Sequence, residues 1–399
     1  MRIFLISLIV SFLTSFAWAV APVNMEDITE IYLSTSPQIQ SAKELHQLSR
    51  RDLWRRYLIN EPQFQYLNQD NGSSEVFGLS LPIAFPGKTF ALRHLDSAKE
   101  KFQEAEVIGK TFEAVKYVVQ AYLDCAGAKQ SLKNINATVG DLQTLYFSLA
   151  AMYESGHSTQ AERIGAELQL RQARSDLHFN EDKAHINCEK LAKIVGTSSD
   201  ELTALPIPED LPSSILNKLD THTADHVRAQ SAIDLAQTNM DIATWSQIPD
   251  LNLSYSRNHY IRDTASPSGD PWTTTYGVSI TIPIFFPFHE RTEIRRTKAQ
   301  ALGDQFAAQI QLQQADLDEA DAFKEYMRST ARLKELQTRD LTLGETLVES
   351  TFSAYKSGKL GFAELMSSRK TLADLKNQEL QLKISIINAH LRCPNKCSL

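Results

Sequence analysis

The sequence consists of two similar halves, and this internal repeat constrains the fold more than any other feature. Pro82 matches Pro283 at an offset of about 201 residues, and a Tyr-x-Ser-Gly tetrapeptide at 153–156 recurs at 355–358. In each copy the residue pattern predicts a short helix, a β-hairpin, a very long helix, a tight turn and a returning helix. We therefore expect a chain built from two structurally equivalent halves.

Side chains alternate most clearly in the second hairpin, at 249–283. Successive residues of a strand point to opposite faces of its sheet, so every second residue belongs to one face. The polar face carries small hydroxyl and amide residues with almost no charge. The apolar face, which we expect to contact lipid, consists of Leu251, Leu253, Tyr255, Trp272, Tyr276, Val278, Ile280 and Ile282. This alternation suits a membrane barrel with water inside, although an amphipathic hairpin on a soluble core has it too.

Each hairpin precedes a very long helical pattern, at 89–152 and at 290–355. Apolar residues recur at intervals of seven along these patterns, which indicates packing of the coiled-coil kind. About 64 residues at a rise of roughly 1.5 Å give a helix of about 95 Å, far longer than the helices of ordinary globular domains. Shorter helices are expected to return after tight turns, at 160–194 and at 362–391.

These patterns divide the chain into five segments. They are a signal peptide at 1–19, a first repeat at 20–196 with its hairpin at 62–82 and its turn at 153–159, a connector at 197–222, a second repeat at 223–392 with its turn at 356–361, and a short tail at 393–399. The signal peptide is inferred from a basic start, a short apolar run and an Ala-x-Ala site, which direct export. No later stretch has the roughly 18 consecutive apolar residues of a transmembrane helix.

Charge and motifs argue against several functions. A net charge of -7 disfavours nucleic acid as a partner. The chain lacks the nucleotide-binding, serine-hydrolase and zinc-protease signatures, so we expect neither an enzyme nor a cofactor. His222 and His226 have the i, i+4 spacing of a metal pair but no evident third ligand, so we expect no metal site.

The repeated order of elements resembles the TolC-type outer membrane efflux protein family. The resemblance rests on the Tyr-x-x-Gly tetrapeptides after the two long helices, and on the Pro-bounded strands that begin at Pro249 and at Gly277. It covers essentially the whole mature chain. It implies a mostly α fold with a small β part: a trimeric α-barrel joined to a twelve-stranded β-barrel, with four strands from each chain.

The resemblance also implies a function and a location. The protein would be a homotrimeric channel-tunnel in the outer membrane of a Gram-negative bacterium, in contact with outer membrane lipid and extending into the periplasm. It would serve a tripartite efflux or export system as a passive conduit. Its partners would be a periplasmic adaptor (a membrane fusion protein) and an inner-membrane transporter.

The strand count supports an oligomer independently of the resemblance. Membrane barrels start at about eight strands and leave no open edge, so four strands cannot close a pore. Three chains would supply twelve. The main alternative is a soluble periplasmic coiled-coil scaffold or adaptor. Such a protein would have the same heptads, and its hairpins would not lie in a membrane. It is disfavoured because the apolar face of the second hairpin would then be exposed to water.

Two acidic residues are candidates for the periplasmic entrance. In the family, acidic residues on the first turn of the last helix line the closed entrance, and Glu364 matches that position. Glu162 is its equivalent in the first repeat. Three-fold symmetry would bring three copies of such a residue near the axis. Alternatively, an acid at a helix N-terminus is simply favoured by the helix dipole.

The two turns are candidates for contact with the adaptor, as the resemblance implies. Their residues are Gly156, His157, Ser158, Thr159, Gly358, Lys359, Leu360 and Gly361. A glycine that ends a helix in a tight turn explains the same pattern without any partner.

A disulfide between Cys125 and Cys188 is also predicted. Cys125 lies 32 residues before His157 and Cys188 lies 31 residues after it, so the two lie at the same height in a helical hairpin. An exported chain meets an oxidising compartment. Cys393 and Cys397 could then bond to each other. The alternative is a pair of buried free thiols on separate helix faces.

Overall fold

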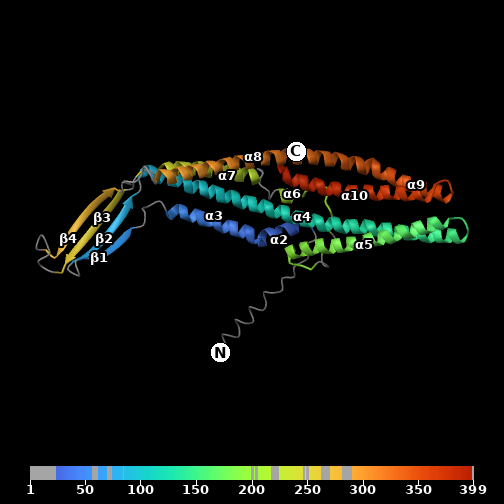
Figure 1. Cartoon of the computed structure of the whole chain (residues 1–399), viewed down its shortest axis with the longest axis horizontal. Helices are drawn as coiled ribbons and strands as arrows, with labels where there is room; N and C mark the ends of the chain where they lie inside the picture. Colours follow the sequence, from blue (N-terminus) through green and yellow to red (C-terminus); the bar gives the residue numbers. More distant parts are fainter. Residues whose placement is uncertain are drawn as a thin grey trace, which may run out of the picture. The chain divides into compact units, whose positions relative to one another are not determined.

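The computed structural model describes residues 24–55, 62–69, 74–83, 85–198, 202, 205–216, 224–245, 248, 251–261, 270–280 and 290–397. Its elements follow the chain from blue to red in Figure 1. They are α2 (Met25–Thr35), α3 (Pro37–Arg55), β1 (Gln63–Gln69), β2 (Ser74–Ile83), α4 (Pro86–Glu154), α5 (Gln160–Val195), α6 (Ser213–Leu216), α7 (Ala224–Trp245), β3 (Leu251–Tyr260), β4 (Trp272–Ile280), α8 (Glu290–Glu335), the π-helical segment η3 (Leu336–Asp340), α9 (Leu341–Lys356), α10 (Phe362–Arg392) and α11 (Pro394–Cys397).

The mostly helical fold with a small antiparallel sheet is confirmed. The first long helix, α4, has 69 residues. The order helix, hairpin, long helix, turn and returning helix occurs in both halves. The predicted signal peptide at 1–19 lies outside the described residues.

The structure differs from the sequence-based expectation at four places, two of which are the short helices α6 in the connector and α11 in the tail. The second long helix is interrupted by η3, where the hydrogen-bonding pattern widens for five residues. Leu336 at the start of η3 is fully buried, and Arg332 forms an ion pair of 3.1 Å with Asp340 at its end. Helix α2 is also additional to the sequence-based expectation; its Ile28 is fully buried in a core contributed by distant segments, which the local pattern does not reveal.

The chain forms two compact units. Unit 1 comprises 1–36, 111–221 and 318–399, and unit 2 comprises 37–110 and 222–317. Each unit therefore draws residues from both halves of the sequence.

Unit 2 contains the four-stranded sheet. Its strands are antiparallel in the order β1-β2-β3-β4, so neighbours in sequence are neighbours in the sheet. The central pairing of β2 with β3 joins the two hairpins, with Leu79 opposite Tyr255 and Ser80 opposite Ser254. β1 and β4 are the two edges of this sheet.

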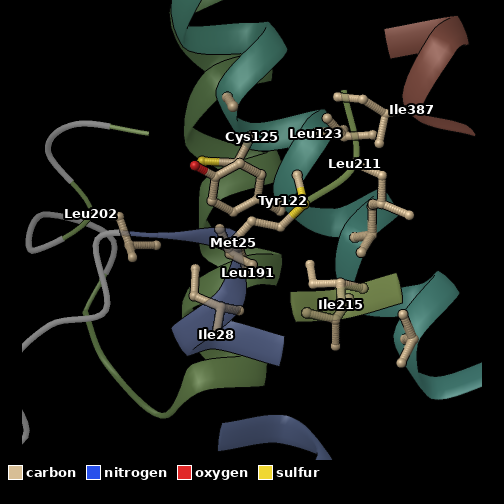
Figure 2. Packing of buried hydrophobic residues seen from close by; sticks show 14 of the residues in the cluster. Met25, Ile28, Tyr122, Leu123, Cys125, Leu191, Leu202, Leu211, Ile215 and Ile387 are labelled. Atoms are coloured by element: carbon tan, nitrogen blue, oxygen red, sulfur yellow. The ribbon is translucent and has the colours of Figure 1, made fainter. Parts of the chain in front are cut away.

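A large apolar core lies in unit 1 (Figure 2). Met25 and Ile28 of α2 meet Leu123 of α4, Leu191 of α5 and Ile387 of α10 there. The connector also contributes, and its fully or almost fully buried apolar residues are Leu202, Leu211 and Ile215. Burial of such side chains contributes about 1.5–3 kcal/mol each. The core therefore holds α2, α4, α5, α10 and the connector together.

Tyr122 anchors the connector to α4. Its hydroxyl donates a 2.8 Å hydrogen bond to the carbonyl oxygen of Pro206. Burial raises the pKa of Tyr122 to about 12. The phenol therefore remains a neutral donor across the physiological pH range.

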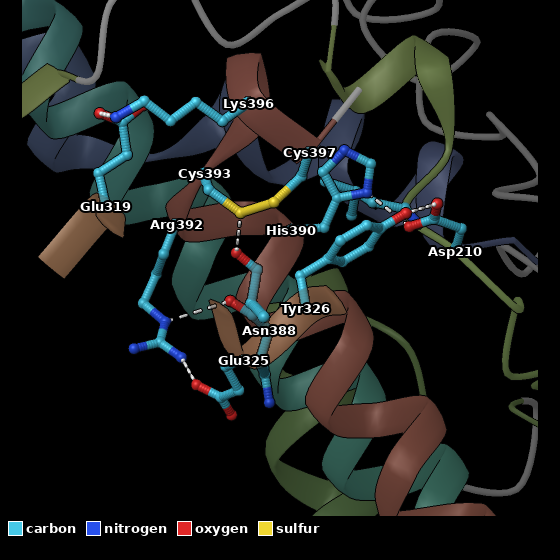
Figure 3. Close-up of a disulfide and its surroundings, with 12 residues drawn as sticks. Asp210, Glu319, Glu325, Tyr326, Asn388, His390, Arg392, Cys393, Lys396 and Cys397 are labelled. Carbon is cyan, nitrogen blue, oxygen red and sulfur yellow. Dashed lines mark hydrogen bonds and ion pairs between the residues drawn. A yellow bond between two sulfur atoms is a disulfide. The ribbon is translucent and has the colours of Figure 1, made fainter. Parts of the chain in front are cut away.

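The C-terminal end of the described chain contains a disulfide (Figure 3). Cys393 and Cys397 are bonded, and both pack on Ala322 of α8. Charged residues surround them: Lys396 lies 2.9 Å from Glu319, and Arg392 pairs with Glu325. These contacts attach α11 and the end of α10 to α8.

Candidate functional site

The apolar face expected from the second hairpin is present in the sheet. The register places Leu251 opposite Ile280, Leu253 opposite Val278, and Tyr255 opposite Tyr276. Residues opposite each other across neighbouring strands lie on the same face. Trp272 lies on this face too, since it is an even number of residues from Tyr276. Ile282 lies outside the described residues.

The first hairpin extends the same face. Leu79 pairs with Tyr255 and Phe77 with Tyr66, so the apolar face continues over β2 and β1. Tyr276 is 79% exposed and Phe64 is 81% exposed. Within one chain nothing described covers this face, although it is mainly aliphatic and aromatic.

The opposite face is lined by small polar side chains. Ser80 lies opposite Ser254, and Ser254 lies opposite Gly277. A Cβ atom at Gly277 would come within 2.5 Å of the Ser254 hydroxyl oxygen, so a larger residue there would require the serine side chain to move. A sheet with an apolar face and a small polar face can separate lipid from water.

The first turn, between α4 and α5, is closed by its own side chains. Gly156 adopts a left-handed φ of 75°, which glycine accommodates without strain. Thr159 and Glu162 form a capping box at the start of α5: Thr159 accepts from the Glu162 amide, and the Glu162 carboxylate accepts from the Thr159 amide at 2.9 Å. Ser158 donates to the same carboxylate at 2.9 Å. The Thr159 amide is the main cause that lowers the pKa of Glu162.

The second turn, between α9 and α10, lacks such a cap. Gly358 has a left-handed φ of 70°, as Gly156 has. Gly361 stands at the N-cap of α10 and offers no side chain. Glu364 is exposed, and its carboxylate folds back so closely that a Cβ atom at Gly361 would lie 2.7 Å from it. Glu162 and Glu364 occupy equivalent helix positions in unlike environments.

The two turns are held together by an apolar cluster. Leu149 of α4, Ala166 of α5, Tyr355 of α9 and Leu365 of α10 are buried in it. Phe362 packs against Gly165, where an added Cβ atom would meet its ring at 3.2 Å. The motif tyrosine Tyr355 thus belongs to the core of this end.

Glu162 and Tyr355 interact electrostatically across the two turns. The pKa of the Tyr355 hydroxyl is raised by burial first, and then by the negative charge of Glu162. The structure thus brings Ser158, Thr159 and Glu162 together with Tyr355. Sequence reasoning missed Phe362 and Gly165 at this end; a glycine inside a helical pattern is a local signal for such close packing.

Cys125 and Cys188 are joined by a disulfide, with Cα atoms 4.7 Å apart. Both are buried in the core of unit 1. The bond links α4 to α5 at the height that equal distance from His157 predicts.

The histidine suspected as a metal ligand has a carboxylate neighbour. Nε2 of His226 lies 2.7 Å from Oδ1 of Asp316. His222 lies outside the described residues. Within the described part of the chain, no group of three or more ligand-type residues could hold a metal ion. Nor does any helix there have both the length and the apolar character needed to cross a membrane.

The chain was compared with known proteins by sequence and by structure. No protein-family model matches the sequence, and no curated protein matches it. Solved structures do match. The outer membrane protein VceC from Vibrio cholerae has a TM-score of 0.76 at 16% identity, over 94% of this chain and 95% of VceC.

Two further structures match over similar lengths. The outer-membrane channel OprN has a TM-score of 0.75 at 16% identity, over 94% of this chain and 89% of OprN. CusC, solved in a study of transmembrane channel formation, has a TM-score of 0.73 at 17% identity, over 94% of this chain and 91% of CusC. The resemblance inferred from the repeat is thereby confirmed for the fold, and the chain has the fold of the TolC-type outer membrane channels.

Proposed function

We propose that the protein is a channel in the outer membrane of a Gram-negative bacterium. It would act as a passive conduit from the periplasm to the outside in a tripartite efflux or export system. The observation that carries this proposal is the four-stranded sheet, with an exposed apolar face on one side and serine, threonine, asparagine and glycine on the other. A soluble scaffold would gain nothing from such a face and would aggregate through it.

The edges of the sheet support a homotrimer. β1 and β4 each have one neighbour among the described strands, so one side of each presents backbone groups without a strand partner. In a bilayer such groups must be paired, which only a closed barrel achieves. Three chains would give twelve strands, within the range of known membrane barrels.

The end formed by the two turns supports a contact with a periplasmic adaptor, and through it with an inner-membrane transporter. The turns are exposed and rest on a buried apolar cluster, so they form a rigid surface. The residues offered there are Gly156, His157, Ser158, Thr159, Gly358, Lys359, Leu360 and Gly361. Glu364 remains the better candidate for the entrance, because Glu162 is engaged in its capping box.

Reconstitution tests the proposal. The purified protein is mixed with lipid vesicles, floated on a density gradient and washed with salt, and its conductance is then measured in planar bilayers. We expect salt-resistant flotation, cross-linking that stops at three chains, and large water-filled conductance steps. A monomer that stays in aqueous buffer without detergent and never conducts would contradict the proposal and favour the soluble scaffold.

A further inference from the structure

A charged and aromatic cluster ends the apolar face of the sheet on the side of the hairpin turns. We name it the hairpin-end cluster, and its members are Tyr66, Glu75, Arg257, His259 and Trp272. The register pairs Glu75 with His259, His259 with Trp272, and Phe77 with Arg257. These pairs continue the face that carries Tyr255 and Tyr276. The apolar face therefore changes within two residue pairs from aliphatic to charged and aromatic.

The carboxylate of the cluster is already engaged. Glu75 accepts a 3.0 Å hydrogen bond from the Tyr66 hydroxyl. Its other oxygen lies 3.7 Å from Nδ1 of His259. His259 in turn stacks on Trp272, with ring centroids 4.2 Å apart.

Arg257 is the group that this cluster leaves available. Its guanidinium lies over the Trp272 ring, 4.5 Å from the centroid, and its side chain is exposed. Among the residues that the structure describes, no carboxylate lies within ion-pair distance of it. The indole supports the guanidinium through a cation–π contact, and the Arg257 side chain is exposed on the surface of the sheet.

We infer that Arg257 binds the phosphate group of an anionic membrane lipid. The inference rests on the proposed function, in which this face contacts lipid. An arginine that faces lipid is costly unless it lies near the membrane surface and meets an anion. A guanidinium matches the paired oxygens of a phosphate, and tryptophan and tyrosine favour the headgroup level. Tyr66, Trp272 and Tyr255 supply such a belt around Arg257.

Lipid selection by the inserted protein tests this inference. The protein is placed in nanodiscs that contain equal amounts of phosphatidylglycerol and phosphatidylcholine. Native mass spectrometry then counts the lipids that remain bound when the protein is released from the nanodisc. We expect a preference for phosphatidylglycerol that falls about tenfold in Arg257→Gln, since one charge-assisted pair is lost. Arg257→Lys should keep part of the preference, because it keeps the charge but not the planar fork.

Arg295→Gln is the matched control. It removes the same charge from an exposed position on α8, outside the sheet, and should leave the lipid preference unchanged. Binding of inorganic phosphate to the protein in nanodiscs of phosphatidylcholine alone, with sodium chloride of equal ionic strength as the reference, separates a lipid site from a site for free anions.

The outcomes are distinguishable. If the wild-type protein never enters nanodiscs, both the proposed function and this inference fail. If it enters them and Arg257→Gln keeps the full preference, the inference alone is overturned. It is also overturned if the protein shows no preference for phosphatidylglycerol and binds inorganic phosphate through Arg257.

Discussion

Glu162 and Glu364 both occupy the third position of a helix that follows a tight turn, but only Glu162 is held by a capping box. Ser158 and Thr159 donate hydrogen bonds to one oxygen, Oε2, of the Glu162 carboxylate, whereas the N-cap before Glu364 is Gly361. The two residues are equivalent in the repeat, but only Glu162 is engaged in capping its helix.

Loss of the first cap should destabilise the end formed by the turns. Thr159→Ala is expected to cost about 1 kcal/mol, the usual contribution of such a cap. Gly361→Ala, at the equivalent position without a side-chain cap, is unsuitable as a control because Glu364 lies too close to an added Cβ atom. Ser353→Ala, at an exposed position on α9, serves instead. Thermal unfolding followed by circular dichroism measures both, and equal shifts in the two variants would contradict the capping role.

The cap should also depend on pH. The pKa of Glu162 is lowered in the folded chain from its ordinary value of 4.5. Its stabilising effect is therefore fully present above pH 4.5 and is lost as the pH falls through the lowered pKa. Glu162→Gln should lower the apparent melting temperature at neutral pH, and the difference from wild type should vanish in acid. A difference that persists unchanged in acid would contradict a role for the charge.

Glu364 should influence ion passage. If three copies line the entrance, Glu364→Ala removes negative charge from a narrow opening, so block by multivalent cations should weaken and the conductance should change. Glu345→Ala is the control, because it removes an exposed carboxylate on α9 away from the turn. Planar-bilayer recordings that show the same cation block in wild type and Glu364→Ala would assign Glu364 to the helix terminus alone.

The two disulfides should differ in their contribution to stability. Cys125 and Cys188 close a loop of 63 residues, whereas Cys393 and Cys397 are only 4 residues apart. On chain-entropy grounds the first contributes about 4 kcal/mol and the second about 2 kcal/mol. Double replacement by alanine, followed by thermal unfolding, should therefore cost more for the first pair. Peptide mapping without reductant provides the direct check, and free thiol at Cys125 in protein extracted from the outer membrane would refute the bond.

The two faces of the sheet should respond differently to charge. Val278→Arg places a cation on the apolar face, at a cost of up to about 4 kcal/mol in the bilayer. Ser279→Arg places it on the polar face, next to water. Flotation with vesicles should fall for the first variant and persist for the second, whose conductance changes instead. Equal flotation of both variants would contradict the assignment of the faces.

Asp210 should stabilise unit 1 through the connector (Figure 3). It accepts a 2.9 Å hydrogen bond from the Tyr326 hydroxyl, and its other oxygen lies 2.5 Å from Nδ1 of the buried His390. Burial, together with the bond to Asp210, raises the pKa of Tyr326 to about 12, so the phenol stays a donor. Asp210→Ala should cost about 2 kcal/mol, because the Tyr326 hydroxyl, His390 and the Leu211 amide all lose an acceptor.

Glu209→Ala is the matched control for Asp210. It removes a neighbouring exposed carboxylate. Thermal unfolding should separate the two variants by several degrees, and equal stability would show that the connector is held by its apolar residues alone.

Local patterns in the sequence determined most of the architecture. The period of two at Leu251, Leu253 and Tyr255 marked a strand face, and the register pairs these residues with apolar residues of β4. Tight turns at Gly156 and Gly358 followed from glycine, which adopts positive φ without strain. Strand alternation and tight turns depend on residues that are close in sequence, so they can be predicted from a single sequence.

Tertiary structure decided the features that depend on distant residues. Helix α2 packs through Ile28 against residues of α4, α5 and α10, which are distant in sequence. The π-helical segment begins at Leu336, which is buried. The difference between Glu162 and Glu364, and the freedom of Arg257 beside an engaged Glu75, also required positions of side chains in space. Heptads and alternation state which face of an element is apolar. They do not state which element covers that face, because that depends on packing between segments far apart in the chain.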